Sequence, residues 1–270
     1  MPMKELNGSE VVGFIKERQL HEVRALVQAH HILPKLAIIR TNQNRVVDVY
    51  MKLKKAYGAD VGVLVEVFDC SEHDAHKVIA KLNADPSVHG IVVQLPLGDV
   101  SQTDELLNSV APEKDVDGLG ESAVFAPATP TAIMWLLAAY NTDLGSSAIT
   151  IMGQGRLVGA PLGRMLKDSG YSVTLVDETT PNTKEITLAS DVIITAVGKP
   201  EVLTSDMVQP GATVIDAGVA TDANGFVGDI ADDVREVRDV RVTPKRGGVG
   251  PLTIAALFEN VITAAKGVML

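Results

Sequence analysis

Tyr50 and Lys54 form the first pair of residues whose types and spacing favour chemistry. They stand four positions apart, so in a helix both side chains project from one face, whereas Lys52 and Lys55 point elsewhere. A lysine whose pKa is lowered by partial burial and by neighbouring cations can transfer protons near neutral pH. The spacing therefore sets Lys54 apart from Lys52 and Lys55, which are interpreted as solvated cations.

A glycine-rich turn in the second half of the chain has the composition of a nucleotide-binding loop. It follows the apolar segment 148–152 and precedes a helical pattern that runs to about Asp168. Glycines at such a turn allow backbone N–H groups to approach a pyrophosphate, and the helix N-terminus adds a favourable field for anions. The glycine spacing is one residue longer than in the commonest dinucleotide fingerprint, so a ligand-free turn is the alternative. The candidate cofactor-binding residues of this turn are Gly153, Gln154, Gly155, Arg156 and Gly159.

Two carboxylates, Asp177 and Glu178, follow the next apolar segment, 172–176. Asp177 stands 24 positions after Gly153, where an acidic residue can accept hydrogen bonds from the adenosine ribose hydroxyls of NAD. Both carboxylates would repel the 2′-phosphate of NADP, so the pair favours NAD. The alternative is that both only decorate an exposed loop. Val219, which ends the apolar segment 213–219, completes the predicted cofactor site.

The elements that must position these groups alternate between strand-like and helix-like patterns along almost the whole chain. This alternation predicts an α/β fold with parallel sheets. Strands are expected at 36–39, 62–68, 90–94, 148–152, 172–176, 191–197 and 213–219. Helices are expected at about 9–30, 46–57, 72–83, 131–140 and 252–266, and after the glycine turn.

The chain has 270 residues, which is long for one compact core, so two domains are expected. We predict an α/β catalytic domain at residues 1–127, joined by the last helix at about 252–270. Residues 128–251 are predicted to form a Rossmann-like dinucleotide-binding domain with a parallel sheet. The segment 117–130, rich in Gly, Ala and Pro, precedes an apolar helix that could bridge the two domains.

The composition excludes several classes of function. The net charge of −10 argues against nucleic-acid binding, because that affinity depends on clusters of cations. The single cysteine, Cys70, excludes a disulfide framework and a cysteine-rich metal site, and no metal is expected. No apolar run is long enough to cross a bilayer, and the first residues lack the apolar core of a signal peptide. A cytoplasmic protein, or a processed mature chain, is therefore expected.

Seven segments carry a resemblance to a known family. They are Tyr50–Ala56 (YMKLKKA), Val92–Leu97 (VVQLPL), Pro112–Gly118 (PEKDVDG), Gly159–Pro161 (GAP), Asp191–Pro200 (DVIITAVGKP), Val214–Gly218 (VIDAG) and Gly247–Thr253 (GGVGPLT). In this order they resemble the bifunctional methylenetetrahydrofolate dehydrogenase/cyclohydrolases of the FolD type. The resemblance implies oxidation of 5,10-methylenetetrahydrofolate to the methenyl form with NAD(P), and then hydrolysis to 10-formyltetrahydrofolate. It also implies a homodimer, a folate site in a cleft between two domains, and NADP as the cofactor of most members.

Carried across by motif, Tyr50, Lys54, Gln94 and Asp115 correspond to the family's active-site residues. The resemblance implies that Lys54 is the proton-transfer group. By this resemblance Gln94 hydrogen-bonds the lysine and Asp115 accepts the donor pair of the pterin, while Tyr50 offers a flat face to the aminobenzoate ring. Without the resemblance, Asp115 and Asp117 are interpreted as loop caps, and Gln94 as a satisfied amide at a strand end.

The loop that precedes the last helix is predicted to lie near the planar part of the ligand, although a simple turn would look similar. Its candidate substrate-binding residues are Gly247, Gly248 and Pro251. Lys245 and Arg246 replace the Val-Pro that the family usually has before the double glycine. They are interpreted as a solvated basic loop, with attraction of the glutamate tail of folate as the alternative.

The clearest departure from the family pattern concerns the cofactor. The usual Gly-Arg-Ser of the nucleotide turn is Gly153-Gln154-Gly155 here, so the arginine that would favour a 2′-phosphate is missing, unless Arg156 compensates. Two other functions stay open at this point. One is a two-domain dehydrogenase of another kind, such as a shikimate type, and the other is a nucleotide-responsive binding protein without turnover.

Overall fold

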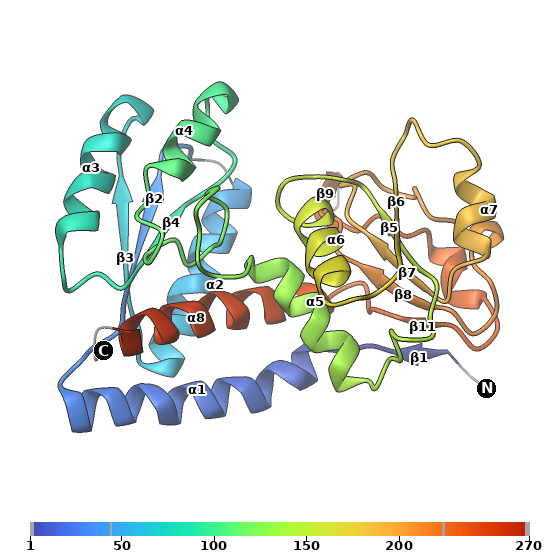
Figure 1. The fold of residues 1–270 in the computed structure, drawn as a ribbon, viewed down its shortest axis with the longest axis horizontal. Helices are drawn as coiled ribbons and strands as arrows, with labels where there is room; N and C mark the ends of the chain where they lie inside the picture. Colours follow the sequence, from blue (N-terminus) through green and yellow to red (C-terminus); the bar gives the residue numbers. More distant parts are fainter. Residues whose placement is uncertain (1–2, 44, 223–224, 268–270) are drawn as a thin grey trace. The chain divides into compact units, whose positions relative to one another are not determined.

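The computed structural model describes residues 3–43, 45–222 and 225–267, and Figure 1 shows the path of the chain. The chain forms two compact units. The first unit comprises Gly13–Ala128 and Ile254–Leu270, and the second unit comprises Met1–Val12 and Thr129–Thr253. Each unit has its own parallel sheet with helices in the connections, so the predicted α/β fold class is confirmed.

The sheet of the first unit has three parallel strands in the order β3-β2-β4 (Figure 1). β2 (Lys35–Arg40) lies in the centre, between β3 (Leu64–Asp69) and β4 (Gly90–Val93). All of β4 and the middle of β2 are buried. Burial on both faces explains why these two strands are continuous apolar runs in the sequence.

The helix α3 (Glu72–Ala84) of the first unit has both an N-terminal cap and an apolar stripe. Ser71 precedes α3, and its side chain accepts a hydrogen bond of 3.2 Å from the backbone N–H of Asp74. The buried residues of α3 recur every three or four positions and join those of β2 and β4 in one core cluster. The unit contains α2 (Arg45–Val61), α3 (Glu72–Ala84), η1 (Val100–Gln102), α4 (Thr103–Asn108) and parts of α1 (Gly8–His30) and α8 (Val249–Gly267).

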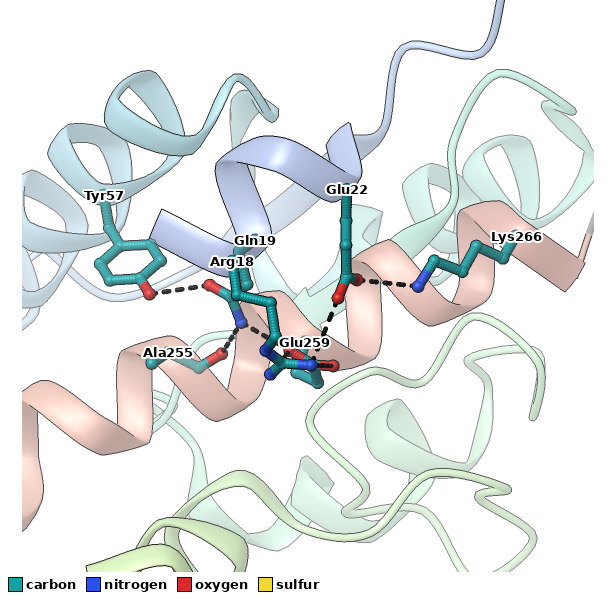
Figure 2. A network of polar contacts seen from close by, with 7 residues as sticks. All are labelled: Arg18, Gln19, Glu22, Tyr57, Ala255, Glu259 and Lys266. Carbon is teal, nitrogen blue, oxygen red and sulfur yellow. Dashed lines mark hydrogen bonds and ion pairs between the residues drawn. The ribbon is translucent and has the colours of Figure 1, made fainter. Parts of the chain in front are cut away.

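A buried polar network ties α1, α2 and α8 together within the first unit (Figure 2). Its centre is Gln19, whose side chain is fully buried. The Gln19 amide donates to the carbonyl of Ala255 over 2.9 Å and to Glu259 over 2.8 Å. Its oxygen accepts a hydrogen bond of 2.8 Å from the Tyr57 hydroxyl. These bonds satisfy the buried polar groups and fix α2, the helix that carries Tyr50 and Lys54, against its neighbours.

The sheet of the second unit has six parallel strands in the order β1-β11-β8-β7-β5-β6. Because β6 lies on one side of β5 and β7 on the other, the direction of strand addition reverses at β5. Ligands of open α/β sheets bind outside the carboxyl ends of the strands at such a reversal. The strands are β1 (Lys4–Glu5), β5 (Ile149–Met152), β6 (Val173–Val176), β7 (Val192–Thr195), β8 (Thr213–Asp216) and β11 (Arg241–Val242).

The remaining elements of the second unit connect these strands. α6 follows the glycine turn, as predicted, and packs so closely on β6 that a Cβ atom on Gly163 would lie 2.9 Å from Leu175. The connecting elements are α5 (Ala128–Ala139, whose first residue belongs to the first unit), α6 (Gly159–Asp168), α7 (Thr183–Leu188), η2 (Ser205–Met207), the antiparallel hairpin β9 (Ala220–Asp222) and β10 (Gly225–Val227), and η3 (Asp232–Glu236).

Two features of the second unit differ from the sequence predictions. β1 and β11 are two residues each, which is too short to leave an alternating pattern in the sequence. Because β1 pairs with β11, residues 1–12 group with the second unit and not with the predicted domain 1–127. The strand expected at 213–219 ends at Asp216, so the candidate Val219 lies in the loop that follows.

Candidate functional site

Lys54 occupies a core-facing position of α2. The buried residues of this helix include Val47, Met51, Lys54, Tyr57 and Val61, which recur every three or four positions along one face. Among the described side chains of α2, Lys54 is the only buried one that carries a charge, with 9% of its surface exposed. An apolar residue would fill this position at lower cost, so a buried lysine here indicates a function.

Gln94 follows β4 directly and receives the lysine. Lys54 Nζ donates a hydrogen bond of 2.9 Å to Gln94 Oε1. The amide Nε2 of Gln94 donates to the carbonyl of Leu95 over 2.7 Å, so the oxygen is the end that faces the lysine. The structure therefore brings together two of the predicted catalytic residues, from a helix and from the carboxyl end of a parallel strand.

Asp117 is the carboxylate that acts on Lys54. Burial lowers the pKa of Lys54, and the charge of Asp117 opposes this shift. Burial likewise raises the pKa of Asp117, and the charge of Lys54 opposes it. The sequence interpretation treats Asp117 only as a possible loop cap, whereas the structure places it in the electrostatic environment of the lysine.

Asp115, the residue predicted to bind the pterin, has a different environment. Its carboxylate accepts three backbone hydrogen bonds, from Gly118 (3.0 Å), Leu119 (3.1 Å) and Gly120 (2.7 Å). The structure thus favours the loop-cap alternative for Asp115 and brings Asp117 to Lys54 instead. The sequence contains a signal for this, because an Asp three positions before a Gly is typical of a capped turn.

The segment that carries Asp117 is held on both sides. The backbone N–H of Ile91 in β4 donates to the carbonyl of Lys114 over 2.7 Å. From α8, the Asn260 amide donates to the carbonyls of Val116 (2.9 Å) and Ala126 (3.0 Å). Sequence reasoning did not identify Asn260, because no local pattern relates it to a loop so distant in the chain.

Tyr50 lies one helical turn before Lys54 on α2 and is partly buried. Burial raises the pKa of its hydroxyl, so the side chain is a neutral phenol at physiological pH. Its predicted contact with the aminobenzoate ring stays a prediction.

The glycine turn of the second unit fits a dinucleotide pyrophosphate. Gly153 has a φ of +94°, and a Cβ atom there would lie 2.5 Å from the carbonyl oxygen of Ala196. A Cβ atom on Gly159 would lie 1.9 Å from the carbonyl oxygen of Gly153. Around the Cβ position of Gly155, by contrast, no atom lies within 4 Å. The two glycines close the turn, and the third leaves open space before the N-terminus of α6, where backbone N–H groups favour an anion.

Asp177 and Gln154 lie together at the carboxyl edge of this sheet. Gln154 Nε2 donates a hydrogen bond of 2.6 Å to Asp177 Oδ2, and Thr179 donates twice to Oδ1. The bonds from Thr179, and to a lesser extent that from Gln154, lower the pKa of Asp177, so this carboxylate is ionised at neutral pH. An ionised carboxylate is the group that accepts ribose hydroxyls and repels a 2′-phosphate.

Glu178 and Val219 meet the loop that follows β7. Lys199 Nζ lies 3.1 Å from Glu178 Oε2, in an exposed ion pair that the sequence analysis did not anticipate. A Cβ atom on Gly198 would lie 3.5 Å from the carbonyl oxygen of Val219. Arg156 is exposed on the glycine turn. The predicted cofactor residues therefore lie on neighbouring loops of the second unit.

The predicted ligand loop at 247–251 also has a structural explanation. Gly247 has a φ of +84°, and its carbonyl accepts a hydrogen bond of 2.9 Å from the N–H of Ser9 at the start of α1. A Cβ atom on Gly8 would lie 1.9 Å from the carbonyl oxygen of Gly248. Pro251 lies in the first turn of α8, and proximity to a ligand stays a prediction for all three residues. Lys245 forms an exposed ion pair of 2.6 Å with Asp232, and its interpretation as a solvated cation stays a prediction.

Two further observations concern the described part of the chain, residues 3–43, 45–222 and 225–267. No group of three or more His, Cys, Asp or Glu residues there is arranged to hold a metal ion. None of the helices in these ranges combines the length and apolar composition needed to cross a membrane.

Sequence comparison relates the chain to one family over almost its whole length. Residues 6–117 match the family described as "Tetrahydrofolate dehydrogenase/cyclohydrolase, catalytic domain", and residues 127–269 match "Tetrahydrofolate dehydrogenase/cyclohydrolase, NAD(P)-binding domain". A bifunctional protein FolD from Nitrosomonas eutropha is 34% identical over 97% of this chain and 93% of its own length.

Solved structures agree with this assignment. The bifunctional FolD enzyme from Campylobacter jejuni has a TM-score of 0.92 at 34% identity, over 98% of this chain and 99% of its own. The Trypanosoma brucei FolD, solved with NADP and an inhibitor, has a TM-score of 0.93 at 27% identity, over 100% of this chain and 99% of its own. A shikimate 5-dehydrogenase from Listeria monocytogenes, at 12% identity and a TM-score of 0.52 over 89% of this chain and 97% of its own, shares the fold alone.

Proposed function

This chain belongs to the tetrahydrofolate dehydrogenase/cyclohydrolase family, and we propose that it oxidises 5,10-methylenetetrahydrofolate and then hydrolyses the methenyl product to 10-formyltetrahydrofolate. The observation that carries this proposal is the partly buried hydrogen bond between Lys54 and Gln94, with Asp117 as the opposing charge. Lys54, Gln94 and Asp117 together supply an amine of altered pKa, a hydrogen-bond acceptor that orients it and a nearby carboxylate. Such a set suits proton transfer at a cationic one-carbon unit.

The dehydrogenase step requires alignment more than acid or base strength. The methylene carbon loses a hydride and a cationic amidinium forms; when bound, NAD(P) supplies the nicotinamide ring that accepts the hydride. The chain's own contribution is to hold both reactants in place. The glycine turn and the first turn of α6 would hold the pyrophosphate, and Gln154 and Asp177 would hold the adenosine ribose.

The cyclohydrolase step requires a group that moves protons. Water adds to the amidinium carbon and loses a proton, and the bond from that carbon to one ring nitrogen then breaks as this nitrogen takes up a proton. We assign both transfers to Lys54, because burial lowers its pKa towards the range in which an amine gives and takes protons. Gln94 orients the amine, since its oxygen is the end that accepts the lysine's hydrogen bond.

Substrate orientation falls to Asp117 and Tyr50 in this proposal. The amide N–H and the amino group of a pterin form a donor pair that a carboxylate accepts with both oxygens. Asp117 suits this role better than Asp115, because three backbone N–H groups already occupy Asp115. Tyr50, on the same helix face as Lys54, would stack on the aminobenzoate ring.

For the cofactor, we infer a preference for NAD over NADP. The Asp177 carboxylate is ionised and fixed by Gln154, and we assign it to the adenosine ribose. The nearby cation Lys199 is paired with Glu178, so its charge is partly neutralised. Both features disfavour a 2′-phosphate, whereas the T. brucei relative is described as complexed with NADP.

A direct assay tests the proposal. Purified protein is mixed with 5,10-methylenetetrahydrofolate and either NAD or NADP, and methenyl formation is followed by its absorbance. Turnover with NAD exceeding that with NADP is the expected result, and no turnover with either nucleotide would refute the dehydrogenase assignment. Tight NAD binding without reaction on any folate would favour the nucleotide-responsive binding protein.

We also propose a homodimer, on the basis of the resemblance and of the edge of the first unit's sheet. β3 lies at that edge, where its outer hydrogen-bonding groups can pair with a second strand, and Leu64 at its start is 42% exposed. Light scattering measures the oligomeric state of the parent protein and of Leu64→Lys. We expect a dimeric parent protein and a weaker dimer for Leu64→Lys, and a monomeric parent protein would refute the proposal. Cytoplasmic localisation stays a prediction.

A further inference from the structure

We propose that Asp229 is a positioning residue of the dinucleotide site, and that its carboxylate shapes the loop Val197–Lys199. The proposal rests on the proposed binding of a dinucleotide at the carboxyl edge of the second unit's sheet. Asp229 follows the β9-β10 hairpin, outside every segment that resembles a nucleotide motif, so sequence reasoning did not single it out.

The contact itself is a set of three backbone hydrogen bonds. Asp229 Oδ2 accepts from the N–H of Val197 over 2.7 Å. Oδ1 accepts from the N–H groups of Gly198, over 2.9 Å, and Lys199, over 3.0 Å. The carboxylate is fully buried, whereas Val197 is 37% exposed and Gly198 and Lys199 are exposed. The inner side of the loop is therefore fixed by one side chain, and its outer side is exposed.

The loop lies where a dinucleotide must pass. It follows β7, which borders β5 at the reversal of strand order. The carbonyl of Ala196, just before the loop, lies 2.5 Å from the Cβ position of Gly153 in the glycine turn. Lys199 reaches Glu178 on the adenosine side. Because β7 and β6 lie on opposite sides of β5, the backbone of the loop after β7 is assigned to the nicotinamide half of the cofactor, while the Lys199 side chain extends back to Glu178.

Asp229 is itself held rigidly. Its backbone N–H donates to Asp216 Oδ1 over 3.1 Å, and its carbonyl accepts from the N–H of Val202 over 2.8 Å. A Cβ atom on Gly218 would lie 1.9 Å from the carboxyl carbon of Asp229, so only glycine admits the side chain there. Asp216 is at the end of β8. Hydrogen bonds therefore connect the sheet, through Asp216 and Asp229, to the loop Val197–Lys199.

The chemistry requires a carboxylate at this position. Three N–H donors converge on it, and an ionised carboxylate has two oxygens to accept them. The amide of an Asn has the same shape but one oxygen, and its NH2 would face at least one backbone donor. Asp229→Asn therefore preserves the volume and disrupts one side of the loop's support.

The test compares Asp229→Asn with Asp143→Asn, because Asp143 also caps a turn of the second unit, by accepting from the N–H of Gly145 over 2.9 Å. In nucleotide-free Asp229→Asn, we expect faster hydrogen exchange at the amides of residues 197–199. The dissociation constant for NAD, measured by calorimetry, should rise by about tenfold or more. Hydrolysis of added methenyltetrahydrofolate without nucleotide should change by less than about twofold, since Lys54 and Gln94, to which we assign this step, belong to the first unit. Asp143→Asn should match the parent protein in all three measurements.

Unchanged exchange and NAD affinity in folded Asp229→Asn would overturn the proposal, and so would a parallel loss of hydrolysis. If that variant does not fold, Gly198→Ala provides the second test. Gly198 is exposed with a φ of +77°, where alanine is strained, so this variant distorts the loop and leaves Asp229 in place. Weaker NAD binding by Gly198→Ala supports the proposal, and unchanged binding overturns it. If the parent protein binds neither nucleotide, the proposed function itself is refuted. If parent and variant bind NAD equally well, only the role of Asp229 is refuted, so the two failures are distinguishable.

Discussion

Lys54 Nζ donates a hydrogen bond of 2.9 Å to Gln94 Oε1, and the same Gln94 amide donates through Nε2 to the Leu95 carbonyl. The glutamine is thus fixed at both ends of its amide group, and the lysine has a defined direction inside the first unit. Burial and the charge of Asp117 act on the lysine's pKa in opposite senses. Gln94 therefore orients the amine of Lys54, and Asp117 raises its pKa against the effect of burial.

Replacing Lys54 by Met should remove the cyclohydrolase activity. Methionine has a similar length and no exchangeable proton, so hydrolysis of methenyltetrahydrofolate should fall by about 100-fold or more. The pKa of Lys54 is lowered in the folded protein. At pH values below the ordinary pKa of lysine, the buried lysine therefore reduces the free energy of unfolding, whereas a methionine at this position does not. We therefore expect the free energy of unfolding of Lys54→Met to equal or exceed that of the parent protein.

The matched control for this variant is Lys52→Met, on the same helix but exposed. It should retain hydrolysis within about twofold, as surface substitutions usually do. NAD affinity should be unaffected in both variants, because the cofactor residues lie in the second unit. Unchanged hydrolysis in Lys54→Met would disprove the role of Lys54.

The pH dependence of hydrolysis should respond to Asp117. The charge of Asp117 raises the pKa of Lys54 against the lowering effect of burial, so Asp117→Asn should lower that pKa further. A neutral amine is then available at lower pH, and the acid limb of the kcat profile should move to lower pH. Stopped-flow hydrolysis at saturating substrate, across the pH range, measures this shift. A limb that stays in place or moves to higher pH would contradict the coupling.

Cofactor selectivity should depend on Asp177. Asp177→Ser removes the ionised carboxylate that Gln154 holds, and with it both the ribose acceptor and the repulsion of a 2′-phosphate. The ratio of kcat/KM for NAD to that for NADP should fall by about tenfold or more, which corresponds to about 1.4 kcal/mol. Asp206→Ser, which removes an exposed carboxylate paired with Lys184 in the same unit, should keep the parent ratio. Equal ratios in the two variants would show that Asp177 does not select the cofactor.

The stability of the first unit should depend on the network around Gln19 (Figure 2). Gln19→Leu leaves the buried Tyr57 hydroxyl and the Ala255 carbonyl without their partner and should cost about 1–3 kcal/mol in the free energy of unfolding. Arg18→Ala removes the exposed pair with Glu259 and should cost at most about 1 kcal/mol. Denaturant unfolding of the two variants gives both values, and equal costs would mean that the buried bonds contribute no more than the exposed pair.

Local patterns in the sequence determined the α/β fold class, the glycine turn before α6 and the shared face of Tyr50 and Lys54. These features depend on the periodicity of side chains along one element and on the conformations that glycine allows, both of which are properties of short segments. For the same reason, the sequence places Gln94 at the end of a buried strand.

Only the tertiary structure decided which groups meet. Asp115 and Asp117 are two positions apart in one loop. Asp115 accepts hydrogen bonds from backbone N–H groups, whereas Asp117 interacts electrostatically with Lys54. The pairing of β1 with β11 and the reach of Asp229 to the loop after β7 are likewise long-range contacts. Such contacts arise from the packing of segments far apart in the chain, and no periodicity within a single segment encodes them.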